Sequence, residues 1–129
     1  MYTSSANTRG IQVDVSARYD AQQSVPEQGH WFFSYQITIS NLSERTVQLV
    51  SRHWVITNAE GKVQTVRGAG VVGQQPSLRP NEGFQYTSGC PLDSPVGTMH
   101  GTYQMVWEDG EAFDALVAPF TLADPMAVN

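Results

Sequence analysis

Cysteine is almost absent from this sequence. Cys90 is the only one in 129 residues, so no disulfide can form within the chain and no zinc site can be built from cysteines alone. Residues 1–15 contain no apolar stretch of signal-peptide length, and no run of about 18 apolar residues occurs anywhere. These absences predict a cytoplasmic protein that does not insert into a membrane.

Basic residues are scarce and scattered. Seven Lys and Arg stand against 12 Asp and Glu, which gives a formal net charge of -5. Affinity for nucleic acid comes largely from clustered Lys and Arg that release counterions, so we expect no nucleic-acid partner. Apolar residues make up 40% of the chain, which is typical of a compact domain with its own core.

The helical repeat is also missing. No window of 11 or more residues repeats its apolar positions every 3.6 residues or so. Apolar and polar residues alternate instead, which is the pattern of half-buried strands. Residues 47–57 are apolar on both faces, as expected for a strand buried on two sides or changing sheets at a bulge. Seven segments are predicted as strands: 12–19, 31–40, 47–57, 62–66, 83–88, 98–108 and 112–122.

Many short strands without helices predict an all-β antiparallel sandwich of about seven strands, favoured over a barrel because one face of each strand alternates cleanly. No repeat or shift in composition divides the chain, so we expect one domain over residues 1–129 with its core at about 11–125. Residues 1–10 and 126–129 offer little apolar surface and are expected to be flexible ends.

Three glycines, Gly68, Gly70 and Gly73, have the spacing G-x-G-x-x-G. In a Rossmann fold this spacing opens a helix that holds a pyrophosphate at its start. Pro76 and Pro80 prevent a helix from following here, because each lacks an amide donor and restricts the residue before it. We therefore predict a loop between strands. Successive glycine amides can still form an anion-binding nest, so binding of phosphate or pyrophosphate stays open.

Metal ligands are not predicted. The acidic residues near Gly110 do not follow a calcium-loop pattern, and solvated charge at a hairpin turn is the default interpretation. The three histidines share no short ligand spacing, and His53 is expected to be a hydrogen-bonded core residue. The residues considered are Glu108, Asp109, Glu111 and Asp114, with His30, His53 and His100.

No catalytic residue is predicted either. Cys90 lies between Gly89 and Pro91 and is expected to be an ordinary loop residue, since no histidine or orienting group can be assigned to it. Ser88 lacks the strand-to-helix elbow of a nucleophilic serine. We expect a protein that is not an enzyme.

Large apolar side chains fall into two groups. Trp31, Trp54 and Trp107 are expected in the core, and Tyr103 resembles the tyrosine corner of β-sandwiches, whose hydroxyl bonds to backbone. Phe32, Val71 and Val72 lie outside the alternating pattern. They are interpreted either as exposed anchors for a partner or as side chains packed under a loop.

Four segments closely resemble the ApaG family in order and spacing: 52–58 (RHWVITN), 68–76 (GAGVVGQQP), 84–89 (FQYTSG) and 97–105 (GTMHGTYQM). The resemblance covers about residues 11–125 and implies an immunoglobulin-like or fibronectin type III-like sandwich. Asn58 stands where many members carry Asp, and Ala69 where a polar residue is common.

Bacterial members of this family are associated with cobalt resistance and magnesium efflux, and similar eukaryotic domains belong to F-box proteins and a polymerase-delta-interacting protein. The resemblance implies a bacterial, non-catalytic protein-interaction module linked to Co2+/Mg2+ homeostasis, without a cofactor. A second copy of the chain is one candidate partner. The alternative is a sensor that holds pyrophosphate or a nucleotide in the glycine loop. The candidate binding residues are Gly68, Gly70, Val71, Val72, Gly73, Gln75 and Pro76.

Overall fold

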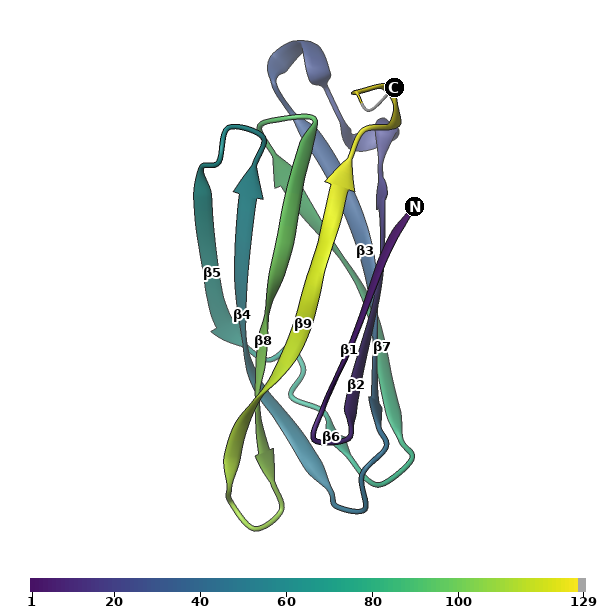
Figure 1. Cartoon of the computed structure of the whole chain (residues 1–129), viewed down its shortest axis with the longest axis vertical. Helices are drawn as coiled ribbons and strands as arrows, with labels where there is room; N and C mark the ends of the chain where they lie inside the picture. The colour runs from purple at the N-terminus through teal and green to yellow at the C-terminus, as the bar shows by residue number, and fades with distance from the viewer. Residues whose placement is uncertain (128–129) are drawn as a thin grey trace.

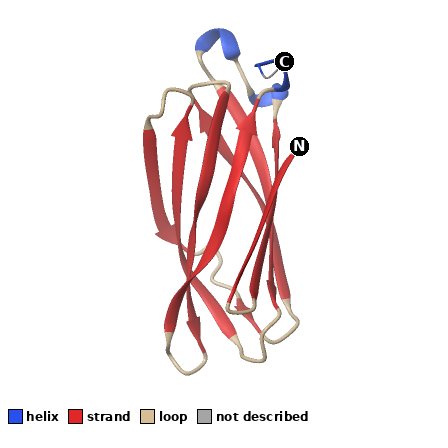
Figure 2. Ribbon diagram, viewed as in Figure 1, coloured by secondary structure: helices blue, strands red, loops and turns tan. Residues whose placement is uncertain are grey.

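The computed structural model describes residues 1–127, which form nine strands and three short 3-10 helices (Figures 1 and 2). None of the helices in this range is long and apolar enough to cross a membrane. The strands are β1 (Tyr2–Thr8), β2 (Ile11–Tyr19), β3 (Trp31–Asn41), β4 (Val47–Asn58), β5 (Val63–Ala69), β6 (Ser77–Leu78), β7 (Gly83–Leu92), β8 (Val96–Trp107) and β9 (Ala112–Ala123). The helices are η1 (Ala21–Gln23), η2 (Pro26–Gln28) and η3 (Pro125–Ala127).

Two antiparallel sheets pack face to face (Figure 1). One has four strands in the order β1-β2-β3-β7, and the other contains β5-β4-β8-β9 with the two-residue β6 paired to β4. The predicted all-β antiparallel sandwich is confirmed. The alternating residues of β2 and β3 point between the sheets, where Ile11, Val13, Phe33 and Ile37 are completely buried. Burying a side chain of this kind contributes about 1.5–3 kcal/mol.

The amino-terminal segment differs from the sequence prediction. Residues 2–8 form β1, which pairs with β2 from Tyr2↔Ala17 to Thr8↔Ile11, whereas a loose end was expected there. The segment has too few apolar residues to show the pattern of a strand, and it is held instead by main-chain pairing along the edge of the sheet. Residues 128 and 129 of the predicted carboxyl-terminal end lie outside the described residues.

The two sides of the sandwich are closed to different degrees. On one side β1 lies against β9, and the Ser4 hydroxyl donates a hydrogen bond to the Ala118 carbonyl at 2.9 Å. The Leu116 amide donates to Thr8 Oγ1 at 3.0 Å on the same side. On the other side β5 and β7 are each the last strand of their sheet, and hollows separate them. The sandwich is therefore sealed along one edge and open along the other.

Candidate functional site

The open side of the sandwich contains one continuous groove, which we call the β5/β7 cleft. It consists of three adjoining hollows with volumes of about 510, 200 and 310 Å³. The first and second share Ile56, Gln64 and Pro91, and the second and third share Tyr35, Arg52, Trp54 and Ser88. The cleft thus runs from the β4–β5 turn at one end to the glycine loop at the other.

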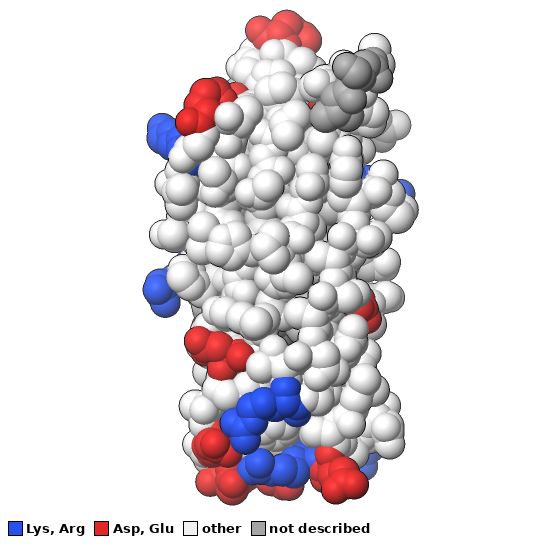
Figure 3. Space-filling model, in the orientation of Figure 1, with Lys and Arg blue, Asp and Glu red and all other residues white. Residues whose placement is uncertain are grey.

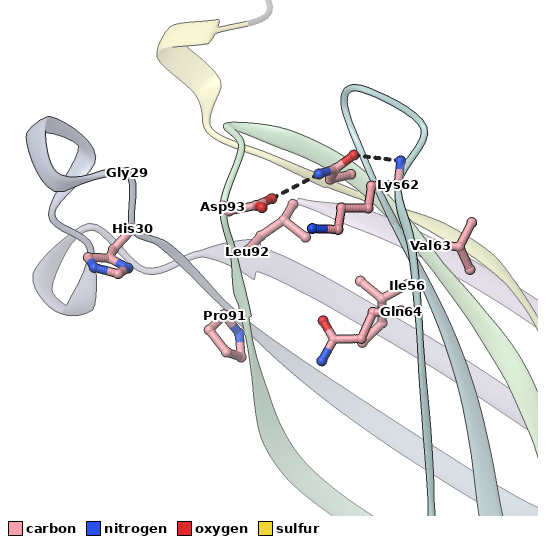
Figure 4. Close-up of a pocket in the computed structure, with 10 residues that line it drawn as sticks. Gly29, His30, Ile56, Lys62, Val63, Gln64, Pro91, Leu92 and Asp93 are labelled. Atoms are coloured by element: carbon pink, nitrogen blue, oxygen red, sulfur yellow. Dashed lines mark hydrogen bonds between the residues drawn. The ribbon is translucent and has the colours of Figure 1, made fainter.

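Asn58 links the two walls at the upper end of the cleft, where it bonds to Asp93 and Lys62, both labelled in Figure 4. Its Nδ2 donates a hydrogen bond to Asp93 Oδ1 at 3.0 Å, while its Oδ1 accepts from the amide of Lys62 at 2.8 Å. Figure 4 shows both bonds, with Ile56 and Gln64 on one wall and Pro91 and Leu92 on the other. An aspartate at position 58 would place a second carboxylate beside Asp93, so the asparagine is needed for this bridge.

The floor of the cleft is aromatic. Trp54 is 3% exposed, and its ring centroid lies 5.8 Å from that of Tyr35 and 5.9 Å from that of Tyr103. The Tyr103 hydroxyl forms a buried hydrogen bond with the Tyr86 hydroxyl on the opposite sheet, so the predicted tyrosine-corner bond to backbone is wrong. Burial raises the pKa of Tyr35, Tyr86 and Tyr103, which keeps the three hydroxyls neutral.

Of the other two tryptophans, Trp107 is buried as predicted, whereas Trp31 is only half-buried and packs against the edge of the core.

Arg52 points into the cleft because of a β-bulge. The register of β4 on β8 shifts between Leu49 and Ser51, so the inward set changes from Val47 and Leu49 to Arg52, Trp54 and Ile56. The sequence of residues 47–57 predicted a strand buried on two sides or one that changes sheets at a bulge; β4 does have a bulge, but it stays within one sheet. Without the shift, the positively charged side chain would lie on the outer face.

The Arg52 guanidinium is half-buried and held from one side. Its Nη1 donates to the carbonyls of Ala69 at 3.1 Å and Gly70 at 2.8 Å. The guanidinium also covers Gly68, since a Cβ there would lie 2.9 Å from Cζ. Within residues 1–127, no carboxylate lies within 4.0 Å of Arg52, and its Nε and Nη2 have no hydrogen-bond acceptor. The cation therefore keeps unused donors at the cleft.

The glycine loop at the lower end is a tight turn, and β6 follows it instead of a helix. The amide of Val71 donates to the Gln74 carbonyl at 2.8 Å, and that of Gln74 donates to the Val71 carbonyl at 2.9 Å. Val72 and Gly73 have φ angles of 43° and 79°, as in a type I′ turn. Gly70 has a φ of 62° and packs so closely that a Cβ would overlap the Gln74 carbonyl.

The remaining candidate residues of this loop hold it to β4. The Gly70 amide donates to the Val50 carbonyl at 2.9 Å, and Gln75 Nε2 donates to the same oxygen at 2.8 Å. The Pro76 carbonyl accepts a bond from the Leu49 amide at 3.0 Å. The amide that a glycine nest would need at position 70 is thus engaged within the fold.

The three apolar residues outside the alternating pattern differ in their surroundings. Val71 is 1% exposed and belongs to the core, whereas Val72 is 52% exposed at the rim of the cleft. A positive φ is costly for a β-branched residue, so the turn holds Val72 in a strained conformation. Phe32 lies over Gly89, where a Cβ would overlap its ring, and so packs on the outer surface of its own sheet.

The predicted acidic group lies at the opposite end of the molecule from the cleft's upper turn, where Figure 3 shows charges of both signs gathered. Arg45 pairs with Asp109 at 2.6 Å and lies over the Trp107 ring at 4.7 Å, and Arg9 pairs with Glu111 at 3.3 Å. These contacts join the β8–β9 turn to the β1–β2 and β3–β4 turns. Across the described part of the chain, no three His, Cys, Asp or Glu side chains are placed to hold a metal ion.

Cys90 and His53 differ from their predicted surroundings. Cys90 lies on β7 rather than in a loop, because this strand extends to Leu92. It is buried, and burial raises the pKa of its thiol to about 11. A cysteine nucleophile needs a lowered thiol pKa, so the shift has the opposite direction. His53 is half-buried on the outer face of the five-stranded sheet, beside His100, and not in the core.

Comparison with known proteins supports the resemblance noted in the sequence. The family model of the ApaG domain matches residues 21–107. The chain belongs to the ApaG family. It is 53% identical to Protein ApaG of Shewanella sp. (strain W3-18-1) over 121 residues, covering 94% of this chain and 96% of that protein. Protein ApaG of Acidithiobacillus ferrooxidans is 54% identical over 113 residues, covering 88% and 89%.

A solved relative has the same fold. The crystal structure of the putative ApaA protein from Bordetella pertussis superposes with a TM-score of 0.88 at 49% identity, covering 93% of this chain and 98% of that chain. The ApaG assignment therefore extends over nearly the whole sandwich, including both walls of the β5/β7 cleft. The cleft itself could not be found from the sequence, because it depends on which strands end the two sheets.

Proposed function

We propose that this ApaG-family protein is a non-catalytic protein-interaction module whose contact surface is the β5/β7 cleft. The observation that carries this proposal is the pair of terminal strands that flank an open, aromatic-floored groove. A terminal strand presents unpaired amides and carbonyls that a partner strand can use. Val72 adds an exposed apolar side chain in a strained conformation at the rim, and such strain is typical of binding sites.

The association of the family with Co2+/Mg2+ homeostasis is compatible with this proposal if the partner protein is the one that handles the cations. The module would act on divalent cations by binding a protein that moves or senses them. A second copy of the chain is the simplest alternative partner, since pairing of two β5 or two β7 edges would give a symmetric dimer. Light scattering after size exclusion tests it, and a monomer at every concentration would rule out self-association.

A pyrophosphate or nucleotide sensor is the second candidate. The amides of Val72 and Gly73 donate no hydrogen bond to any described residue, and Arg52 lies beside the loop. The Gly70 amide is engaged by Val50, which leaves fewer donors than a nest of three glycines would offer. Calorimetry with ATP, pyrophosphate and Mg2+ tests the sensor. Absence of heat at millimolar ligand, where sites of about -4 kcal/mol begin to fill, would reject it.

Photo-crosslinking inside cells tests the interaction module. A benzophenone amino acid replaces Gln64, which is exposed on the wall of the cleft, and in a control chain it replaces Leu116, which is exposed on the outer face of the five-stranded sheet. The proposal predicts a discrete protein adduct from position 64 and none of the same mass from position 116. Identical adducts, or none from position 64, would contradict it.

A further inference from the structure

The β5/β7 cleft is positively charged although the chain carries a net charge of -5. β7 contains no charged residue, and the one charged residue of β5, Arg67, does not line the cleft. Arg52 lies in the floor, and Lys62 lines the upper end. The one acidic residue at the cleft, Asp93, is hydrogen bonded to Asn58. A segment that enters this cleft would therefore meet positive charge on a largely apolar surface.

Arg52 is the cation that such a segment would meet in the middle of the groove. Buried charges are ordinarily paired, because desolvation of an unpaired ion is costly. Arg52 is half-buried against Trp54 and Tyr35, and within the described chain its only acceptors are two carbonyls that bind Nη1. The edge formed by Nε and Nη2 remains free. This is an edge that a carboxylate can engage with two parallel hydrogen bonds.

The strands on either side favour an extended occupant. A segment added to the edge of β5 or β7 would satisfy main-chain donors and acceptors, and its side chains would point alternately into and out of the cleft. Those that point inward would meet Trp54, Ile56 and Met99 in the middle of the groove. The same geometry places an inward side chain opposite Arg52, where Ser88 supplies a further hydroxyl.

We infer that the β5/β7 cleft binds an extended, acidic segment of a partner protein, in which apolar side chains alternate and one carboxylate pairs with the Nε and Nη2 edge of Arg52. This inference rests on the proposed interaction function and adds the chemistry of the partner. The bulge in β4 then determines the preference for an acidic segment, because it turns the positively charged Arg52 side chain from the outer face into the groove.

The test uses the full chain and two synthetic peptides. Each is an eleven-residue peptide with blocked ends in which Thr occupies the odd positions and Val the even ones. The sixth residue, on the same face as the valines, is either Glu or Gln. NMR follows the side-chain Nε–H signal of Arg52 and the indole N–H signal of Trp54 during titration. The Glu peptide is expected to bind at least about tenfold more tightly than the Gln peptide, because a hydrogen bond between two charged groups is stronger than one to a neutral amide. Its binding should shift both signals.

Matched variants separate the charge of Arg52 from its position. Arg52→Gln should abolish the preference for Glu, and Arg52→Lys should restore part of it, because lysine keeps the charge but not the bidentate edge. Arg67→Gln removes the same charge from an exposed position on β5 and should leave the preference unchanged. The direct shift of the Arg52 signal in the unmodified chain remains informative even if Arg52→Gln loosens the glycine loop.

Three outcomes would overturn the inference: equal binding of the two peptides, no binding of either at millimolar concentration, or a shift of the Arg52 signal by inorganic pyrophosphate alone. These three outcomes concern only the chemistry of the bound segment. Whether the cleft binds a protein at all is tested separately by the crosslink at Gln64. A partner captured there without any preference for Glu would show a protein-binding cleft of different chemistry. No partner there would remove the interaction function itself.

Discussion

The three glycines of the G-x-G-x-x-G spacing have different structural roles, and Gly70→Ala is the most informative substitution. The residue has a φ of 62°, and a left-handed conformation costs an alanine about 1–2 kcal/mol. The new Cβ would also overlap the Gln74 carbonyl, which accepts the Val71 amide at 2.8 Å. Moving that carbonyl sacrifices a hydrogen bond of about 1 kcal/mol. We therefore expect the free energy of unfolding to fall by about 2–3 kcal/mol in total.

Urea unfolding followed by tryptophan fluorescence measures this loss. With a slope of about 1.5 kcal/mol per molar urea, the midpoint should fall by about 1.3–2 M. Gly73→Ala is the matched control in the same turn, since its φ is 79° and a Cβ there would meet no atom within 4 Å. Gly73→Ala should lower the free energy of unfolding by only about 1 kcal/mol, because alanine is disfavoured in the left-handed backbone conformation.

Gly68→Ala should act differently from both. Its Cβ would meet the Arg52 guanidinium, the mobile end of a long side chain, so stability should change by less than about 1 kcal/mol. The NMR signal of Arg52 Nε–H should move clearly. Equal losses of stability in all three variants would refute the assignment of separate roles. A loss below about 0.5 kcal/mol for Gly70→Ala would refute the tight-turn argument itself.

Four further predictions concern the hydrogen bond between Asn58 and Asp93 and the buried hydroxyl and thiol groups. Asn58→Asp should lower the free energy of unfolding by about 1 kcal/mol, through loss of the hydrogen bond to Asp93 and repulsion between the two carboxylates, and adding Asp93→Asn should recover part of it in urea unfolding. Tyr103→Phe should cost about 1–2 kcal/mol, because it leaves the buried Tyr86 hydroxyl without its partner, and thermal unfolding measures this. Cys90 should resist a disulfide reagent at pH 8 and react at a rate set by unfolding, because burial raises the pKa of its thiol to about 11. The same shift, with a reference thiol pKa of 9.0, means that stability is complete below about pH 9 and declines as the pH rises toward 11, which urea titrations across this range would detect.

The alternating strands were predictable because burial of one face determines their pattern. β2, β3 and the core residues of β8 follow that rule, so their positions agree with the sequence. β1 does not, because a terminal strand can be held by main-chain pairing without an apolar face. Tyr103 was expected to bond locally, and its actual partner, Tyr86, is fixed by the packing of two sheets, which no local pattern reports.

The candidate site was only partly predictable. Pro76 and Pro80 correctly excluded a helix after the glycine loop, since their effect on the backbone is local. The inward direction of Arg52 was not predictable, because it depends on a one-residue register shift in β4. The open side of the sandwich depends on strand order, which is a property of the whole chain. The loop was thus visible in the sequence, whereas the cleft beside it was not.

β5 and β7 are the two edge strands with which a partner is expected to pair. Amide hydrogen exchange, measured for the free chain and for its complex with the partner captured at Gln64, tests this directly. Slower exchange is expected at residues 63–69, at residues 83–92, or at both, with little change in β9. Unchanged exchange in these two strands, with protection on the outer face of the five-stranded sheet around Leu116, would contradict it.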